Sequence, residues 1–351
     1  MSHPDFRTIL RESYSGDRVL VTGGASFIGS HLVELLLEAG ADVTVADDLS
    51  SGHVENLAAV AERISFHRGD LRDAGLARRA TQRQQTVFHL AAMHGGRGYI
   101  DTHPVECMNN LVLDHAVLTA AAAAQVGRVV FASSACAYPT TLQSSATERG
   151  LLPETAAGFE VQGAAFPDGE YGWAKLMGEM QVRAFHKQYG MDAIACRLFT
   201  AYGPRENESH AVIALIAKAL ARMDPFPVWG DGTQTRNFTF VDDTAMGMAL
   251  AGARLRGFDV VNVGSPIHTS IQELMELIFQ LLDWSPKSID YQLDKPVGVL
   301  SRAADVSKSE LLLGWSPQVP LRQGLERTTS WCTTNLDAAR LARLDQALMS
   351  R

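Results

Sequence analysis

Up to residue 200 the chain alternates short apolar runs with longer segments whose apolar residues recur at helical spacing. The apolar runs have the length of buried strands, and they cover residues 18–21, 42–46, 64–67, 86–90, 128–132 and 192–198. The helical spacing covers residues 28–40, 72–84, 105–125 and 170–189. Strands that alternate with helices in this way predict an α/β fold: a Rossmann-type doubly wound parallel sheet with helices on both faces.

Beyond residue 203 this simple alternation stops. Helical patterns at 210–221, 242–254, 271–282 and 308–313 are mixed with shorter apolar or extended segments at 225–229, 236–240 and 260–263. We therefore expect a smaller C-terminal α/β domain after the sheet. The first 17 residues precede the first strand, and we expect them to form an extension outside the core fold.

A glycine-rich turn joins the first predicted strand to the first predicted helix. It has Gly23, Ser26 and Gly29 at the three positions where dinucleotide-binding turns carry glycine, so only the middle position departs from the pattern. The free N–H groups of such a turn and of the helix start bind a pyrophosphate, and the Ser26 hydroxyl can hydrogen-bond a phosphate oxygen. The second strand ends at Asp47 and Asp48, where a carboxylate binds ribose hydroxyls. The sequence therefore predicts NAD rather than NADP.

Composition and charge exclude several other classes of protein. The 351 residues are 46% hydrophobic and 20% charged, which is typical of a folded protein with a large core. The net charge of −8 and the dispersed basic residues argue against nucleic-acid binding, and no apolar run has membrane-spanning length. The start of the chain is polar, unlike a signal peptide, and the four cysteines are isolated, without metal-ligand spacing. We expect a cytoplasmic protein that binds no metal and no membrane.

Side chains that can move protons follow the strand at 128–132. Ser134 and Cys136 lie at its end, and a later helix carries Tyr171 and Lys175, four residues apart and therefore on one face. A lysine beside a tyrosine lowers the pKa of the phenol, and a serine hydroxyl can hydrogen-bond the reacting oxygen. Such a tyrosine can remove the proton of an alcohol while hydride leaves the same carbon.

The motifs that carry these residues resemble those of a known family in order and spacing. They read TGGASFIGSHL, DDLSSG, GDL, FHLAA, FASSACAYP, YGWAK, RLFTAYGPR, WGDGTQTRNFTFVDD and VNVGS. Over residues 18–330 the chain is similar to extended short-chain dehydrogenases/reductases of the nucleotide-sugar epimerase/dehydratase kind. The resemblance implies tightly held NAD, a catalytic group of Ser134, Tyr171 and Lys175, a nucleoside-diphosphate sugar as substrate, and a homodimer.

The resemblance also implies a domain division and a set of cofactor contacts. Residues 18–203, with 238–264 returning, would form the NAD-binding domain, and residues 204–237 and 265–340 the substrate-binding domain. Asp70 and Leu71 would flank the adenine. The predicted NAD contacts are Gly23, Ser26, Phe27, Ile28, Gly29, Asp47, Asp48, Asp70, Leu71, Leu90, Ala91, Ala92, Asn110, Tyr171 and Lys175.

Within this family the chain most resembles the GDP-mannose 3,5-epimerases. HLAAMHGGRGYI resembles their glycine-rich substrate loop, SSACAYP the strand end in which a cysteine is an acid/base, and WGDGTQTRNFTFVDD a nucleotide-binding segment. Cys136 would be that acid/base, and His210 aligns with the family's second one, a lysine. The implied substrate contacts, with Arg236 and Arg302 on the diphosphate, are Gly95, Gly96, Arg97, Ser134, Thr200, Arg236 and Arg302.

Three departures from the epimerase pattern leave the nucleotide base and the sugar open. Thr200 replaces an asparagine, Arg97 an apolar residue, and Leu300 the first of two arginines. The expected activity is epimerisation at C3, C5 or both through a transient 4-keto sugar. A 4-epimerase would use the same oxidation and leave Cys136 idle. A 4,6-dehydratase would need a carboxylic acid where Cys136 stands, and an NAD(H)-binding sensor would need no catalytic group.

Overall fold

The computed structural model describes residues 5–158 and 166–336, and its centre is a parallel sheet of seven strands. The strands lie in the order β11-β6-β5-β4-β1-β2-β3. Their bounds are β1 (Arg18–Thr22), β2 (Asp42–Asp47), β3 (Ile64–Arg68), β4 (Thr86–His89), β5 (Arg128–Ser134), β6 (Asp192–Leu198) and β11 (Phe258–Val263). The predicted Rossmann-type fold class is confirmed. Because the strand order reverses on either side of β1, the edge beyond its carboxyl end is where such a sheet binds ligands.

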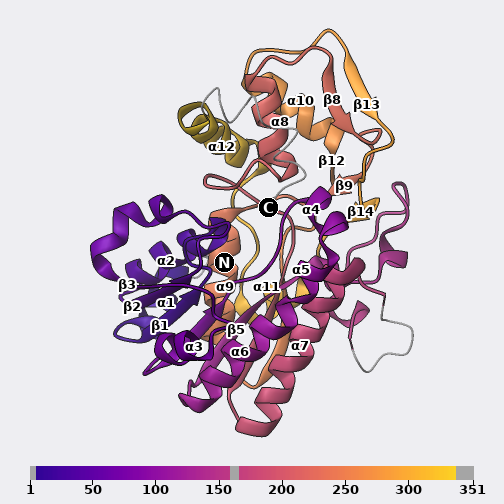
Figure 1. The fold of residues 1–351 in the computed structure, drawn as a ribbon. Coiled ribbons are helices and arrows are strands. Elements are labelled where there is room, and N and C mark those ends of the chain that lie inside the picture. The colour runs from indigo at the N-terminus through magenta and orange to yellow at the C-terminus, as the bar shows by residue number, and fades with distance from the viewer. Residues whose placement is uncertain (1–4, 159–165, 337–351) are drawn as a thin grey trace.

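Helices cover both faces of this sheet (Figure 1). One layer contains α1 (Phe6–Tyr14), α2 (Phe27–Glu38), α9 (Val241–Arg254) and α11 (Ser307–Leu313). The other contains α3 (Ala74–Thr81), α5 (Pro104–Met108), α6 (Asn110–Ala123) and α7 (Gly169–Tyr189). Successive residues of a strand face opposite sides of the sheet. Val19 and Val21 belong to the core under α2 and α9, whereas Leu20 belongs to the core under α3 and α6.

The C-terminal part has a separate hydrophobic core and lies beyond one end of the sheet (Figure 1). Its helices are α8 (Ala211–Leu220), α10 (Ile271–Leu281) and α12 (Leu321–Asn335). Two small sheets accompany them: β8 (Phe226–Trp229) with β13 (Ile289–Gln292), and β9 (Thr235–Arg236) between β12 (Thr269–Ser270) and β14 (Ser301–Arg302). Two further short strands, β7 (Ala201–Tyr202) and β10 (Thr239–Phe240), pair where the chain leaves and re-enters the main layers.

Short helical segments connect the larger elements. They are α4 (Arg97–Thr102), η1 (Val54–Arg63), η2 (Ala135–Ala137), η3 (Thr140–Gln143) and η4 (Glu154–Ala156). No helix within residues 5–158 and 166–336 is long and apolar enough to cross a bilayer.

Two predicted elements differ in the structure. The first residues do not stay outside the core, because Leu10 and Tyr14 of α1 are buried and the Tyr14 hydroxyl donates a hydrogen bond to the Ala249 carbonyl at 2.7 Å. The helix expected at 105–125 is two helices that meet at Asn109. Helix α12 was not expected. Residues 1–4 of the predicted extension and 337–340 of the predicted substrate domain lie outside the described residues.

Candidate active site

A cavity of about 900 Å3 opens at the carboxyl edge of the sheet, between the main layers and the C-terminal part. This volume lies within the usual range for ligand sites, near its upper end. All five predicted catalytic residues line it: Ser134, Cys136, Tyr171, Lys175 and His210. It also brings together the predicted substrate contacts Gly95, Gly96, Arg97, Thr200, Arg236 and Arg302. Residues from distant parts of the sequence therefore meet around one space.

The glycine turn between β1 and α2 leaves room only for backbone. Gly23 has a φ of 68°, and a Cβ there would lie 2.8 Å from the Ala91 nitrogen. A Cβ at Gly29 would lie 2.1 Å from the Gly23 carbonyl oxygen, so the start of α2 packs directly on the turn. The Ser26 hydroxyl donates to that same carbonyl at 2.5 Å and closes the turn. The first N–H groups of α2 have no carbonyl partner within the helix, which suits them to phosphate oxygens.

The carboxylate of Asp47 is tied to the turn rather than left free. Its two oxygens accept the N–H groups of Ala25 (2.9 Å) and Leu49 (2.8 Å), and the residue is 6% exposed. A smaller pocket of about 40 Å3 adjoins this carboxylate, and most of the predicted NAD contacts line it. They include Gly23, Ser26, Asp47, Asp48, Asp70, Leu71, Leu90, Ala91 and Ala92.

Two predicted cofactor residues line neither pocket. Gly29 acts through packing, as its contact with Gly23 indicates. Asn110 is fully buried, and its side chain accepts from the Met93 N–H at 2.6 Å and donates to the Met93 carbonyl at 2.9 Å. It thereby fixes the backbone that follows β4. The turn, the helix start and the strand-end carboxylates together fit a dinucleotide.

Burial dominates the protonation of the tyrosine and lysine. The Lys175 ammonium donates to the Ala132 carbonyl at 2.9 Å and lies 5.8 Å from the centre of the Tyr171 ring. Burial raises the pKa of Tyr171 far above its ordinary value, and hydrogen bonding with Ser134 acts in the opposite direction. Burial also lowers the pKa of Lys175. In the protein alone, burial therefore raises the phenol pKa, contrary to the expected lowering.

Cys136 has a charged neighbour that the sequence did not indicate. Its Sγ accepts a hydrogen bond from Arg302 Nη1 at 3.3 Å, although the two residues are 166 positions apart. Arg302 Nη2 donates to one oxygen of Asp168 at 3.0 Å, and Arg97 Nη1 donates to the other at 2.8 Å. Asp168 directly precedes α7, the helix of Tyr171, and was not predicted as a site residue.

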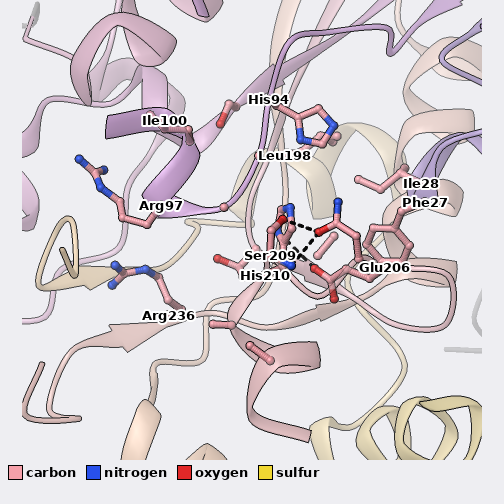
Figure 2. A pocket seen from close by; sticks show the side chains of 18 of the residues that line it. Phe27, Ile28, His94, Arg97, Ile100, Leu198, Glu206, Ser209, His210 and Arg236 are labelled. Carbon is pink, nitrogen blue, oxygen red and sulfur yellow. Dashed lines mark hydrogen bonds and ion pairs between the residues drawn. The ribbon is translucent and has the colours of Figure 1, made fainter. Parts of the chain in front are cut away.

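A histidine and a glutamate form another part of the cavity wall (Figure 2). His210 Nδ1 lies 3.4 Å from Glu206 Oε1, and the His210 ring meets that of His94 edge to face at 6.2 Å. Burial raises the pKa of Glu206 well above its ordinary value and lowers that of His210 to about 4. The histidine ring is still 32% exposed, so it can reach a ligand. Glu206 was not predicted either; its only sequence signal is its place after the YGPR motif.

The segments that carry Gly96 and Ser209 touch backbone to backbone beside the cavity. A Cβ at Gly96 would lie 1.9 Å from the Ser209 carbonyl oxygen, so only glycine fits there. Arg97 follows the first segment and His210 the second. The described residues contain no group of three or more His, Cys, Asp or Glu side chains arranged to hold a metal ion.

Comparisons with known proteins agree with this geometry. Residues 19–264 match the NAD dependent epimerase/dehydratase family. GDP-mannose 3,5-epimerase of Arabidopsis thaliana is 30% identical, and the match covers 98% of this chain and 90% of that protein.

Two solved structures share the fold. The dTDP-glucose 4,6-dehydratase of Streptomyces venezuelae, solved with NAD, has a TM-score of 0.80 at 30% identity and covers 91% of this chain and 97% of its own. The UDP-glucuronic acid 4-epimerase of Bacillus cereus was solved with UDP-glucuronic acid and NAD. It has a TM-score of 0.79 at 28% identity, and the match covers 90% of this chain and 99% of that one. The predicted resemblance and the predicted cofactor, NAD, are confirmed. The chain belongs to the NAD-dependent epimerase/dehydratase family.

Proposed function

We propose that this protein is an NAD-dependent epimerase of nucleotide sugars that inverts C3, C5 or both through a transient 4-keto sugar. The observation that carries the proposal is the position of Cys136. Its side chain lines the cavity two residues beyond Ser134, together with Ser134 and Tyr171. A thiol there can exchange protons with the carbons next to the oxidised one.

The first step is oxidation at C4. Tyr171, as the phenolate, takes the proton of the C4 hydroxyl, and Ser134 hydrogen-bonds the same oxygen. The Lys175 cation, 5.8 Å from the centre of the Tyr171 ring, favours the phenolate and opposes the effect of burial. The chemistry supplied by bound NAD is hydride transfer, away from C4 and later back to it. Lys175 is 2% exposed, so water has little access to its ammonium group.

The second step is proton exchange at the carbons beside the ketone. A C4 ketone acidifies the C3 and C5 hydrogens, so a nearby base can remove one of them and leave an enolate. Cys136 is the group we assign to one sugar face, and His210 to the opposite face. The lowered pKa of His210, about 4, keeps the ring neutral at pH 7 with one ring nitrogen unprotonated, and the same burial makes it a weaker base than a free imidazole.

The relatives named above act at three different places on the sugar, and UDP-sugar 4-epimerisation is the alternative supported by one of them. It uses the same oxidation but turns the keto sugar over, so Cys136 would take no part. Dehydration is less well supported, because the Ala135-Cys136 pair offers no carboxyl group at the strand end.

Deuterium uptake from solvent separates these reactions. The protein is incubated in D2O with GDP-, UDP- and dTDP-sugars, and the products are analysed by mass spectrometry. The proposal predicts deuterium at C3 or C5, and Cys136→Ser should slow that exchange about 100-fold while a transient NADH signal remains. Tyr171→Phe should abolish both. If Cys136→Ser exchanges deuterium at the wild-type rate, or if the wild type inverts C4 without exchange, the 4-epimerase alternative replaces the proposal.

A further inference from the structure

The segment between β7 and α8 brings a carboxyl group against the His210 ring (Figure 2). Glu206 Oε1 lies 3.4 Å from His210 Nδ1. Between them the segment is folded by Asn207, whose side-chain oxygen accepts both the N–H (3.1 Å) and the hydroxyl group of Ser209. Arg205 anchors the start of the segment, because its guanidinium donates to a glutamate of α2 at 2.7 Å. The contact between the carboxyl group and the ring is therefore built into a held segment.

The surroundings of Glu206 favour the neutral carboxylic acid. Its side chain is 3% exposed although it lines the cavity, and Oε2 has no hydrogen-bond partner in the described part of the chain. Burial raises the pKa of Glu206 well above its ordinary value, and hydrogen bonding with the backbone of Gly203 acts in the opposite direction. A carboxylate in this place would lose most of its hydration, whereas the acid loses little.

His210 is a weak proton-transfer group when it acts alone. Burial lowers its pKa to about 4, so the ring binds an extra proton only weakly. A neutral ring that gave up its own N–H proton would become an anion, which a buried site disfavours. Because Nδ1 faces Glu206, Nε2 on the other side of the ring is the nitrogen left for a ligand in the cavity. The ring is 32% exposed, enough for such a contact.

We propose that Glu206 is a positioning residue that acts through His210, supplying and taking back the proton that the ring exchanges with the sugar. This role rests on the proposed function, in which His210 serves one face of a keto sugar. In the resting pair the Glu206 hydroxyl faces Nδ1, and Nε2 carries the ring proton. A separation of 3.4 Å is long for this contact, and catalytic hydrogen bonds commonly shorten when substrate binds.

The transfer balances without any charge left on the ring. Nε2 gives its proton to the enolate carbon, and the electron pair of the N–H bond stays on nitrogen. Nδ1 takes the Glu206 proton, and the electron pair of the O–H bond stays on oxygen. The negative charge of the enolate therefore ends on the Glu206 carboxylate, while His210 is neutral before and after. Removal of a C–H proton is the same transfer in reverse.

Other titratable and charged groups share the cavity with this pair. His94 meets the His210 ring edge to face at 6.2 Å and lines both the cavity and the smaller pocket. Cationic side chains of other elements also line the cavity, among them Arg97 of α4, Lys175 of α7 and Arg236 of β9. Glu206 is the carboxyl group at ion-pair distance from the ring. Its replacement should consequently affect proton transfer through His210 more than replacement of a neighbouring acid.

Three variants test this role. Glu206→Gln keeps the size of the side chain and can still hydrogen-bond Nδ1, but it has no carboxyl proton to transfer. His210→Asn removes the ring at the N-cap of α8, a position that asparagine suits. Glu208→Gln is the matched control, because Glu208 is a buried acid of the same segment that lies outside the cavity wall.

The first readout is an infrared difference spectrum of the NAD-loaded protein at pH 7, which needs no substrate. A carboxylic acid and a carboxylate absorb at separate positions. Glu206→Gln should therefore remove one band of a protonated carboxyl group from the wild-type spectrum. His210→Asn should keep that band but shift it, because the partner of the carboxyl hydroxyl has changed. Loss of a carboxylate band in Glu206→Gln would overturn the proposal.

The second readout is the rate at which the product inverted at C3 or C5 forms in D2O, with the transient NADH signal followed alongside. Glu206→Gln should slow inversion about 10- to 100-fold and leave the NADH signal, while Glu208→Gln should stay within about 2-fold of the wild type. His210→Asn should slow inversion at least as much as Glu206→Gln. Adding Glu206→Gln to His210→Asn should change the rate by less than about 2-fold, because two groups that act in one transfer are not additive.

Inversion at the wild-type rate in Glu206→Gln, or a further loss when it is added to His210→Asn, would overturn the proposal. If the wild type itself inverts neither C3 nor C5, the proposed function fails and the transfer through His210 fails with it; the infrared arm then decides only whether Glu206 is protonated. Should Glu206→Gln not fold, Glu206→Asp takes its place. It keeps the acid band but holds the acid farther from Nδ1, so inversion should slow about 10-fold, and an unchanged rate would contradict the role.

Discussion

Replacing Glu179 by alanine should destabilise the protein strongly, because it leaves the charge of Arg197 buried without its carboxylate. Arg197 Nε and Nη2 each donate to one oxygen of Glu179 at 2.9 Å, and both side chains are 1% exposed. Glu179 also accepts the Ser133 hydroxyl at 2.5 Å. The pair therefore joins α7, β5 and β6 directly behind the catalytic residues.

The size of the effect follows from the burial of the pair. Breaking a buried ion pair by removing one partner costs about 3–5 kcal/mol. Unfolding entropy is about 2.1 cal/mol/K per residue, or about 0.74 kcal/mol/K for 351 residues, so the midpoint of thermal unfolding should fall by about 4–7 °C. The remaining bonds of Arg197, to the carbonyls of Glu154 and Ala157 at 2.9 Å, supply no negative charge to offset this loss.

Thermal unfolding followed by circular dichroism measures this shift on the NAD-loaded protein. Glu326→Ala is the matched control, since Glu326 forms a looser pair with Arg322 at 4.0 Å and both side chains are 53% exposed. A pair of this kind contributes about 0–1 kcal/mol, so the control should lower the midpoint by less than about 1.5 °C. If Glu179→Ala behaves like the control, the reasoning from burial is refuted.

Two further predictions concern the cofactor and the assembly. NADP should bind more weakly than NAD because Asp47 and Asp48 would repel its 2′-phosphate; titration of the apoprotein with both cofactors checks this, and equal affinities would contradict it. The protein should be a homodimer through α5, α6 and α7, where Val105, Val112 and Met180 are exposed, and Met180→Glu should weaken it; light scattering that finds a wild-type monomer at micromolar concentration would count against it.

The sheet could be predicted well because each strand is recognised from its own short stretch of sequence. Each strand is a short apolar run, and the carboxyl ends of parallel strands meet at one edge whatever the loops do, so Ser134 and Gly23 could be placed near one ligand. The break at Asn109 instead lies beside a non-local contact, the two hydrogen bonds of Asn110 with Met93. Helical spacing alone could not indicate it.

Two residues of the cavity wall were not predicted for the same reason, namely that the sequence pattern around them does not indicate their surroundings in the fold. Asp168 and Glu206 lie in connecting segments. The partners of Asp168, Arg302 and Arg97, come from other elements, whereas Glu206 pairs with His210 four residues along the same segment. Nothing in the local pattern distinguishes these carboxylates from ordinary surface acids. Their importance depends on a burial that only the folded loops create. Likewise, α12 has few apolar residues; Leu325 and Cys332 join the C-terminal core, and Gly324 lies close against Tyr202.

The backbone contact between Gly96 and Ser209 has a consequence for any redesign of sugar specificity. The segment before Arg97 and the segment before His210 cannot be widened independently, because displacing one pushes the carbonyl of the other. A mutant library that varies only residues 94–97 would explore few folded shapes, with Gly96 unable to change at all. Libraries should instead vary residues 94–97 and 206–210 together, treating the two segments as a single engineering unit.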